Sequence, residues 1–320
     1  MIKAISLYSG GLDSILARRI MSQQGIDVIA VNFVMPFGCS KKSVDKDIEK
    51  VDITNDFLEI LKAPAHGYGS NMNPCIDCKI LMLKKAKKLM EERGASFIIT
   101  GEVVGQRPMS QMRGMLKHIE RQAGVEGLVV RPLSAKLLPV TIAEEKGWID
   151  REKLFDINGR GRKRQFEIAQ EYGITDVPQP AGGCLLTDPI YAARIKDLIS
   201  HKNLKADDIN ILRFGRYFRL GENSRVIVGR NERDNELLEN AKKEGDMFFK
   251  SKDQIPGPSA LGRGDFSDPA VLELALKLVA RYFSKKEKNT KVKLELYYNN
   301  EVRLVETDAL DEVQAKKYAV

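Results

Sequence analysis

The motif SGGLDS at residues 9–14 is the feature that most constrains the fold of this chain. It directly follows a short apolar run at residues 2–8, and residues 13–24 have helical spacing. Two adjacent glycines permit positive φ and let the backbone approach a ligand closely, while the first N–H groups of a helix attract phosphate. The carboxylate of Asp13 would hold Mg²⁺. The sequence therefore predicts a phosphate-binding turn, with a plain strand-to-helix turn as the alternative.

Short apolar runs alternate with amphipathic helices over the first 190 residues. The expected strands are 2–8, 27–35, 96–100 and 127–131, and the expected helices are 13–24, 43–62, 79–92, 109–121 and 163–172. This alternation predicts an α/β fold, with a parallel sheet flanked by helices and ligands at the carboxyl ends of the strands.

The alternation fades beyond residue 190. There we expect a helical segment at 189–213, strands at 225–229, 246–250, 291–297 and 301–306, and helices near 231–243 and 268–283. This pattern predicts a second, smaller α+β domain. We place the two domains at residues 1–200 and 213–320.

Charge and targeting signals narrow the class of protein. The formal net charge is +8, which fits a polyanionic partner such as nucleic acid, although a basic enzyme without such a partner is the alternative. The N-terminus lacks the apolar region and cleavage site of a signal peptide, and no apolar run approaches the ~18 residues of a membrane span. We therefore expect a cytoplasmic protein without membrane association.

Four cysteines are present, at positions 39, 75, 78 and 184. Cys75 and Cys78 form a Cys-x-x-Cys pair, a spacing that indicates metal, cluster or redox chemistry in a cytosolic chain. A cysteine at a helix N-terminus has a lowered pKa, so thiolates are expected. Together with Cys184 the pair could bind three irons of a 4Fe–4S cluster. The alternatives are structural zinc with Cys39 or His66 as fourth ligand, a persulfide mechanism, and inert buried cysteines.

These motifs together resemble a known family. SGGLDS lacks the Gly-Lys-Ser/Thr of a Walker loop and resembles the PP-loop of the ATP pyrophosphatases. Residues 100–106 (TGEVVGQ), the following Ser110-Gln111 and the strand end Arg131-Pro132-Leu133 are similar to segments of the tRNA 4-thiouridine synthases. The cysteine set is similar to that of cluster-dependent 2-thiouridine and 4-thiouridine synthases. The resemblance covers roughly residues 1–190.

The resemblance implies an ATP-dependent tRNA sulfurtransferase. ATP would adenylate the uridine carbonyl oxygen with release of pyrophosphate, and sulfur would then replace AMP. The resemblance favours 4-thiouridine as the product, with 2-thiouridine as the alternative. The implied cofactors are ATP, Mg²⁺ and a 4Fe–4S cluster, and the implied partners are tRNA and a sulfur donor, either sulfide or a cysteine desulfurase; a homodimer is left open. Asp13, Cys78 and Cys184 would be catalytic, and Cys75, Cys78 and Cys184 would hold the cluster. The residues that would bind ATP are Ser9, Gly10, Gly11, Leu12, Asp13, Ser14, Gly101 and Gln106.

Basic residues and the C-terminal segment supply the expected tRNA contacts. The candidates, each with a solvated helix face as the alternative, are Arg107, Arg113, Lys117, Arg160, Arg162, Lys163 and Arg164. Residues 213–283 resemble the NFACT RNA-binding module, through VIVGRN at 226–231 and GDMFFK at 245–250. Because the PP-loop begins at residue 9, we expect this module to replace the THUMP-type RNA-binding domain of the thiouridine synthases; a dimerisation or lid domain is the alternative. We also expect no rhodanese-like domain.

Two other classes of function stay open. One is a PP-loop ligase acting on a small metabolite, and the other is a non-enzymatic RNA-binding protein with a decayed nucleotide site. The basic charge and the cysteine set favour thiolation over the first, and the intact SGGLDS motif argues against decay.

Overall fold

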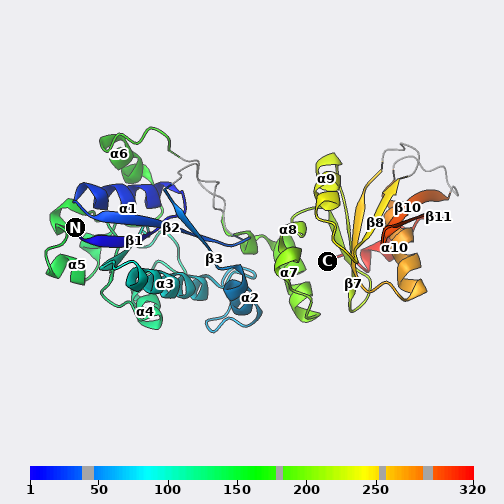
Figure 1. Cartoon of the computed structure of the whole chain (residues 1–320), viewed down its shortest axis with the longest axis horizontal. Coiled ribbons are helices and arrows are strands. Elements are labelled where there is room, and N and C mark those ends of the chain that lie inside the picture. The colour runs from blue at the N-terminus through cyan, green and yellow to red at the C-terminus, as the bar shows by residue number, and fades with distance from the viewer. Residues whose placement is uncertain (38–46, 178–182, 252–256, 284–290) are drawn as a thin grey trace. The chain divides into compact units, whose positions relative to one another are not determined.

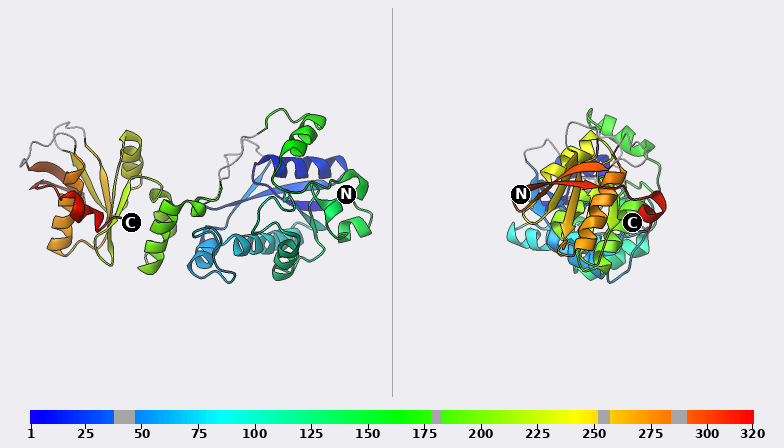
Figure 2. Two further views of the ribbon diagram at one scale, coloured as in Figure 1. Left: turned by 180° about the vertical axis from the view of Figure 1, so that it is seen from behind. Right: turned by 90° about the vertical axis from the view of Figure 1, so that its right-hand side faces the viewer.

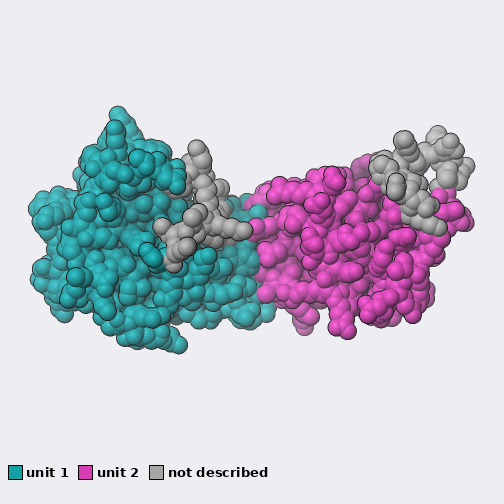
Figure 3. Space-filling model, turned by 45° about the horizontal axis from the view of Figure 1, so that its top comes forward, with its two compact units in different colours: residues 1–187 teal, residues 188–320 magenta. Residues whose placement is uncertain are grey.

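The computed structural model describes residues 1–37, 47–177, 183–251, 257–283 and 291–320. The chain divides into two compact units, residues 1–187 and residues 188–320, which Figure 3 colours separately. Within the described ranges, no helix is both long and apolar enough to span a membrane.

The first unit is built on a five-stranded parallel sheet. Its order is β3-β2-β1-β4-β5, with β1 in the centre. The strands are β1 (Lys3–Leu7), β2 (Asp27–Val34), β3 (Glu49–Asp52), β4 (Phe97–Thr100) and β5 (Val129–Val130). The strand order switches sides at β1, because β2 and β3 lie on one side of β1 while β4 and β5 lie on the other. Open α/β sheets bind ligands at such a switch point. The predicted parallel sheet is confirmed.

Helices cover both faces of this sheet, as Figures 1 and 2 show. The helices of this unit are α1 (Leu12–Gln23), α2 (Thr54–Lys62), α3 (Cys75–Glu92), α4 (Arg113–Ala123), α5 (Ile142–Glu145) and α6 (Lys163–Glu171). Because successive strand residues point to opposite faces, Ala4 packs in the core beneath α1 and α6, whereas Ile5 packs in the core above α3 and α4. Three single 3₁₀ turns complete the unit, at Ala135–Leu137, Arg151–Lys153 and Leu185–Thr187.

The helix expected at residues 43–62 is confirmed only in its second half. Residues 49–52 form strand β3, which extends the sheet beside β2, and only Thr54–Lys62 are helical. Asp52 accepts a hydrogen bond from the Thr54 backbone N–H at 2.7 Å, a local contact that ends the strand and starts the helix. The edge of β2 offered backbone partners to this segment, and that tertiary pairing overrode its helical spacing. Residues 43–46 lie outside the described residues.

The second unit is built on a six-stranded antiparallel sheet of order β11-β10-β8-β9-β7-β6. The strands are β6 (Arg216–Arg219), β7 (Ser224–Val228), β8 (Met247–Ser251), β9 (Ala260–Gly264), β10 (Val292–Tyr298) and β11 (Glu301–Thr307). Helix α10 (Pro269–Arg281) packs its apolar residues, among them Ala275 and Val279, into the core of this sheet. Helices α9 (Glu232–Asn240) and α11 (Glu312–Lys316) also belong to this unit. The predicted α+β domain is confirmed, although β6 and β9 were not expected.

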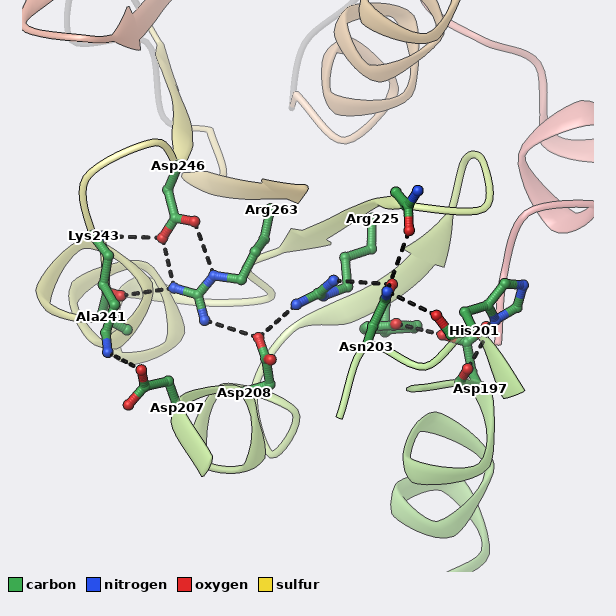
Figure 4. A network of polar contacts seen from close by, with 12 residues as sticks. Asp197, His201, Asn203, Asp207, Asp208, Arg225, Ala241, Lys243, Asp246 and Arg263 are labelled. Atoms are coloured by element: carbon green, nitrogen blue, oxygen red, sulfur yellow. Dashed lines mark hydrogen bonds and ion pairs between the residues drawn. The ribbon is translucent and has the colours of Figure 1, made fainter. Parts of the chain in front are cut away.

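Helices α7 (Pro189–Ser200) and α8 (Ala206–Ile211) belong to the second unit. Figure 4 shows the polar network behind this assignment: the buried Asp208 of α8 receives hydrogen bonds from Arg225 at 2.6 Å and from Arg263 at 3.0 Å. Asp197 of α7 pairs with Arg219 in the same way. We expected the first domain to reach residue 200, but these buried ion pairs join α7 to the antiparallel sheet.

Candidate active site

The SGGLDS turn connects β1 to α1 and leaves the N-terminus of that helix open. Gly10 has φ of 73°, a conformation that residues with a Cβ rarely adopt. The Ser14 hydroxyl donates to the Gly11 carbonyl at 2.8 Å and accepts from the Ser9 backbone N–H at 3.3 Å. Among the described residues no side chain caps α1. The turn is thus held in a fixed shape while the first N–H groups of the helix remain available to an anion.

Gly101 lies where β4 ends and meets this turn directly. A Cβ added to Gly101 would lie 2.5 Å from the carbonyl carbon of Asp13 and 2.6 Å from the backbone nitrogen of Ser14. Only glycine permits this approach, because real Cβ contacts are not that short. The segment expected to bind ATP is therefore in backbone contact with the phosphate turn, and both lie at the carboxyl edge of neighbouring parallel strands.

Asp13 carries the carboxylate of the turn and is oriented by Gln106. Gln106 Nε2 donates to Asp13 Oδ2 at 3.1 Å, whereas Oδ1 is buried with no hydrogen-bond partner among the described residues. Burial raises the pKa of Asp13, while the Gln106 hydrogen bond and then the Arg162 guanidinium pull that pKa down. A buried acceptor without a partner is expensive, so Oδ1 fits a cation ligand.

Two residues of α6 and its N-terminal turn also face this carboxylate. Arg162 lies over the Phe166 ring at 5.4 Å and is close enough to Asp13 to lower its pKa. Gln165 is fully buried and also lowers that pKa, although neither of its polar atoms completes a hydrogen bond of normal geometry. The sequence reasoning had placed Arg162 among tRNA contacts and had missed Gln165, since a glutamine on an amphipathic helix gives no signal of burial.

A buried ion cluster lies behind the turn and was also missed. Glu102 accepts from Lys79 at 2.8 Å and from Arg131 Nε at 3.1 Å, and Arg131 also pairs with Glu120. Despite the opposing effect of burial, these two cations lower the pKa of Glu102 to about 2. The cluster joins the first turn of α3 to the ends of β4 and β5. The sequence signal that could have predicted this cluster is an acidic residue, Glu102, just beyond the end of an apolar strand.

The three described cysteines lie around the N-terminus of α3. Cys75 and Cys78 are in its first turn, so the helix begins at the motif and not at residue 79 as expected. The Cys75 thiol donates to Ser110 Oγ at 3.2 Å. Cys184 is brought to this end of the helix by the segment that follows it. Met72 donates its N–H to the Leu186 carbonyl at 3.1 Å, and the Asn71 amide donates to the Thr187 carbonyl at 2.7 Å.

The other two thiols are near enough to affect Cys78. The pKa of the Cys78 thiol is raised to about 12, mainly by burial and in smaller part by Cys184 and Cys75, while Lys79 opposes the shift. The expectation of a lowered pKa is therefore wrong for Cys78, because burial outweighs the helix N-terminus. No three histidine, cysteine or acidic side chains of the described ranges have the spacing of a metal site. Cys39 lies outside the described residues.

His66, the alternative zinc ligand, contacts groups other than the cysteines. Its Nδ1 lies 2.8 Å from Asp77 Oδ1, and its Nε2 lies 2.9 Å from Nε2 of His118 on α4. Both ring nitrogens are therefore engaged outside the cysteine set. Asp77 also accepts the His66 backbone N–H at 3.0 Å, so this chain of contacts fastens the loop before α3 to the helix that carries Cys75 and Cys78.

The predicted tRNA-binding residues come from three segments of the first unit. Arg107 is exposed and affects both Asp13 and Cys78 electrostatically, lowering the pKa of each. Arg113 and Lys117 lie on α4, where Lys117 is 4.0 Å from Glu126. Arg164 is paired on its own helix with Glu167 and Glu171. Arg160, Lys163 and Arg164 are all exposed at or just before the start of α6.

The first unit is an α/β domain with a glycine-rich turn at the carboxyl edge of its parallel sheet, and the second unit is an antiparallel α+β domain. Comparison with protein families finds a match for each unit. Residues 2–137 match the family described as thiamine biosynthesis protein (ThiI), and residues 215–319 match the NFACT protein RNA binding domain. Residues 2–137 are therefore similar to ThiI proteins and residues 215–319 are similar to NFACT RNA-binding domains, the two resemblances found in the sequence.

Individual relatives agree with the first of these matches. A probable tRNA sulfurtransferase of Methanobrevibacter smithii is 31% identical over 48% of this chain and 43% of its own length. One from Thermococcus kodakarensis is 26% identical over 35% of this chain and 32% of its own length. The chain thus spans less than half of these relatives. Among solved structures, a 4-thiouridine synthetase–RNA complex with bound ATP is 21% identical over 65% of this chain and 53% of that chain, with a TM-score of 0.39.

Proposed function

We propose that this protein is an ATP-dependent tRNA sulfurtransferase that converts a uridine carbonyl to a thiocarbonyl. One observation carries the proposal: Arg107 affects the pKa of both Asp13 and Cys78, so the phosphate turn and the cysteines face one cationic side chain. A nucleotide and a sulfur group held at these two places would both be within the electrostatic reach of Arg107. The ThiI match over residues 2–137 supports the same activity.

In the first half of the reaction the uridine oxygen attacks the α-phosphorus of ATP and pyrophosphate leaves. The open N–H groups of α1 would bind the phosphates, and Arg162 and Arg107 would offset the charge that develops on the leaving group. Mg²⁺ would be held by Asp13, whose buried Oδ1 fits a cation, and when bound it neutralises phosphate charge. Gln106 holds Asp13 in the required orientation.

In the second half a sulfur nucleophile attacks the activated carbon and AMP leaves with the former carbonyl oxygen. We assign the sulfur handling to Cys184 and Cys78. A persulfide on Cys184, whose outer sulfur is transferred from a cysteine desulfurase persulfide, would attack the carbon. Cys78 would then attack the Cys184 sulfur of the resulting disulfide and release the thiouridine, leaving a Cys78–Cys184 disulfide that an external dithiol reduces. The effect of Cys184 on the pKa of Cys78 supports their pairing. Since burial keeps Cys78 protonated in the free protein, substrate binding must help to deprotonate it.

The 4Fe–4S cluster stays a prediction. Three sulfur ligands suit an iron–sulfur cluster, but the described cysteines do not have the spacing of a metal site, so no step of this mechanism passes through a cluster. Mass spectrometry of tRNA nucleosides tests the activity itself. Deletion of the gene should remove one thiolated uridine, which the wild-type gene restores and an Asp13→Ala variant does not. Unchanged thiouridine in the deletion strain would contradict the proposal.

We assign the product as 4-thiouridine in preference to 2-thiouridine. The residues 100–106, which resemble the 4-thiouridine synthases, contact the phosphate turn through Gly101 and Gln106. Activation by ATP does not choose between the two carbonyls, so the choice rests on how the flipped base is held. Chromatographic separation of the two isomers decides it. Loss of 2-thiouridine alone would overturn this assignment and leave the thiolation mechanism intact.

A further inference from the structure

The second unit contains a cavity of about 380 Å³ where β6, the end of α10 and α11 meet. This volume falls in the range of small-ligand sites. The cavity belongs wholly to the second unit and is separate from the phosphate turn, which is in the first. The lining residues that matter here are Arg194, Arg216, Arg281, Tyr282, Glu312 and Lys316.

The cavity has an excess of positive side chains. Arg194 is buried and donates to the backbone carbonyls of Leu212 at 2.6 Å and Gly215 at 3.0 Å, and Arg216 donates to the Gly229 carbonyl at 3.3 Å. Within the described ranges neither arginine has a carboxylate at ion-pair distance. Burial lowers the pKa of Arg194, the direction expected for a cation without a close counter-charge. Such a site favours an anionic ligand.

The remaining charged side chains of the cavity do not cancel this excess. Arg281 and Lys316 share one carboxylate, that of Glu312, at 3.3 Å and 2.9 Å. The Glu312 side chain is 62% exposed, so both of these pairs are weak. Among the side chains that line the cavity, four cations thus face one carboxylate.

An aromatic ring lies beside these cations. The Arg216 guanidinium is 4.7 Å from the centre of the Tyr282 ring, and that of Arg281 is 6.0 Å away. Tyr282 is half-buried and packs against Phe218 at 5.9 Å, which fixes the ring in place. An anchored ring with a guanidinium at its face is a stacking surface for a nucleobase, and cations close by suit the adjoining phosphate.

We propose that this cavity binds one unpaired nucleotide of an RNA, with the base stacked at Tyr282 and the phosphate held by Arg216, Arg281 and Lys316. RNA is favoured over an acidic protein segment because the site joins a stacking surface to the cations, and because residues 215–319 match an RNA-binding domain. That the RNA is a tRNA rests on the proposed function. The cavity would then grip tRNA at a position other than the base that is modified.

The test measures the affinity of the full chain for tRNA and for a single-stranded oligouridylate over a series of salt concentrations. Arg216→Gln removes a phosphate contact, so it should weaken binding and reduce the salt slope by about 1. Tyr282→Leu removes stacking, so it should weaken binding about tenfold without changing the slope. The matched controls are Arg303→Gln and Tyr298→Leu, exposed residues of β11 and β10 outside the cavity, which should leave both quantities unchanged.

The outcomes separate the cavity from the proposed function. Unchanged binding by both cavity variants would overturn the cavity assignment while leaving the function intact. A changed slope with no effect of Tyr282→Leu would overturn base stacking, and competition by polyglutamate as effective as that by RNA would overturn the choice of ligand. Binding of oligouridylate through the cavity without binding of tRNA would support the cavity and contradict the function. Should Tyr282→Leu fail to fold, ultraviolet cross-linking of oligouridylate to the wild type must map to the peptide that contains Tyr282.

Discussion

Gln106 donates a hydrogen bond to Asp13 over 3.1 Å, although 93 residues separate the two in sequence. The contact joins the turn after β4 to the turn after β1, two neighbouring strands of the parallel sheet. It fixes one carboxylate oxygen of Asp13 and leaves the other, which is buried, for a ligand. The site is therefore assembled by sheet order and not by local sequence.

Replacing Gln106 with leucine should shift the pH dependence of pyrophosphate release. The Gln106 hydrogen bond lowers the pKa of Asp13, so its loss raises that pKa further above its ordinary value. The carboxylate of Asp13 is then ionised only at higher pH, so the acidic limb of the pH–rate profile should shift to higher pH. The rate itself should fall roughly tenfold or more, the worth of a hydrogen bond to a charged group. Gln170→Leu, on the exposed face of α6, is the control; an unmoved acidic limb in Gln106→Leu would remove Gln106 from this role.

Gly101→Ala should abolish ATP binding and destabilise the first unit. The added methyl group would lie 2.5 Å from the Asp13 backbone, and relief of that overlap requires β4 and the phosphate turn to separate. Overpacking of this kind costs about 1–3 kcal/mol. Gly114→Ala is a matched control in α4, because a Cβ there meets nothing within 4 Å. That variant should be neutral or stabilising by up to about 1 kcal/mol. Equal nucleotide affinity of the two variants, measured by calorimetry, would contradict the close contact.

Glu102→Gln should destabilise the protein strongly, although it changes no residue of the SGGLDS turn. It leaves Arg131 and Lys79 without their shared carboxylate, and breaking a buried ion pair costs about 3–5 kcal/mol. Denaturant unfolding monitored by circular dichroism measures the loss.

The loss of unfolding free energy in Glu102→Gln should become smaller as the pH falls. The pKa of Glu102 is lowered from 4.5 to about 2 in the folded state, so its stabilisation is complete above pH 4.5 and disappears as the pH falls from there toward 2. The difference in unfolding free energy between wild type and variant should shrink over this window. A difference that stays constant through the window would show that Glu102 is not held as the carboxylate.

Cys184→Ser should separate the two halves of the proposed reaction. Pyrophosphate release from ATP in the presence of tRNA should continue, because the substitution leaves the residues of the SGGLDS turn unchanged, while thiouridine formation should stop. Wild type and variant are compared in the same reaction mixture, with pyrophosphate and thiouridine as paired readouts. Loss of both products would mean that Cys184 serves nucleotide binding and not sulfur transfer.

Iron analysis of protein purified without oxygen checks the predicted cluster. About four irons per chain in the wild type, lost in Cys75→Ser and Cys184→Ser alike, would support ligation by these cysteines. Full thiolation by iron-free protein would contradict the cluster and favour the persulfide mechanism.

The sequence by itself determined the glycine-rich turn at residues 9–14, the parallel sheet and the α+β class of the second domain. The SGGLDS turn can be predicted from its own residues alone, because two glycines between a strand and a helix specify a local backbone shape. The alternation of apolar runs and amphipathic helices likewise specifies βαβ units, since each pattern is a property of a short segment. The positions of Asp13, Gly101 and the Cys75–Cys78 pair followed from such local signals.

Only the tertiary structure decided which of these segments meet and what their side chains experience. Residues 49–52 became a strand because the edge of β2 offered them partners, which no local pattern could reveal. Burial raised the pKa of Cys78 against the expectation for a helix N-terminus, and Gln165 came to face Asp13 from a helix 150 residues further along. Burial and electrostatic effects depend on distances between residues remote in sequence, and these distances exist only once the sheet has placed its strands in order.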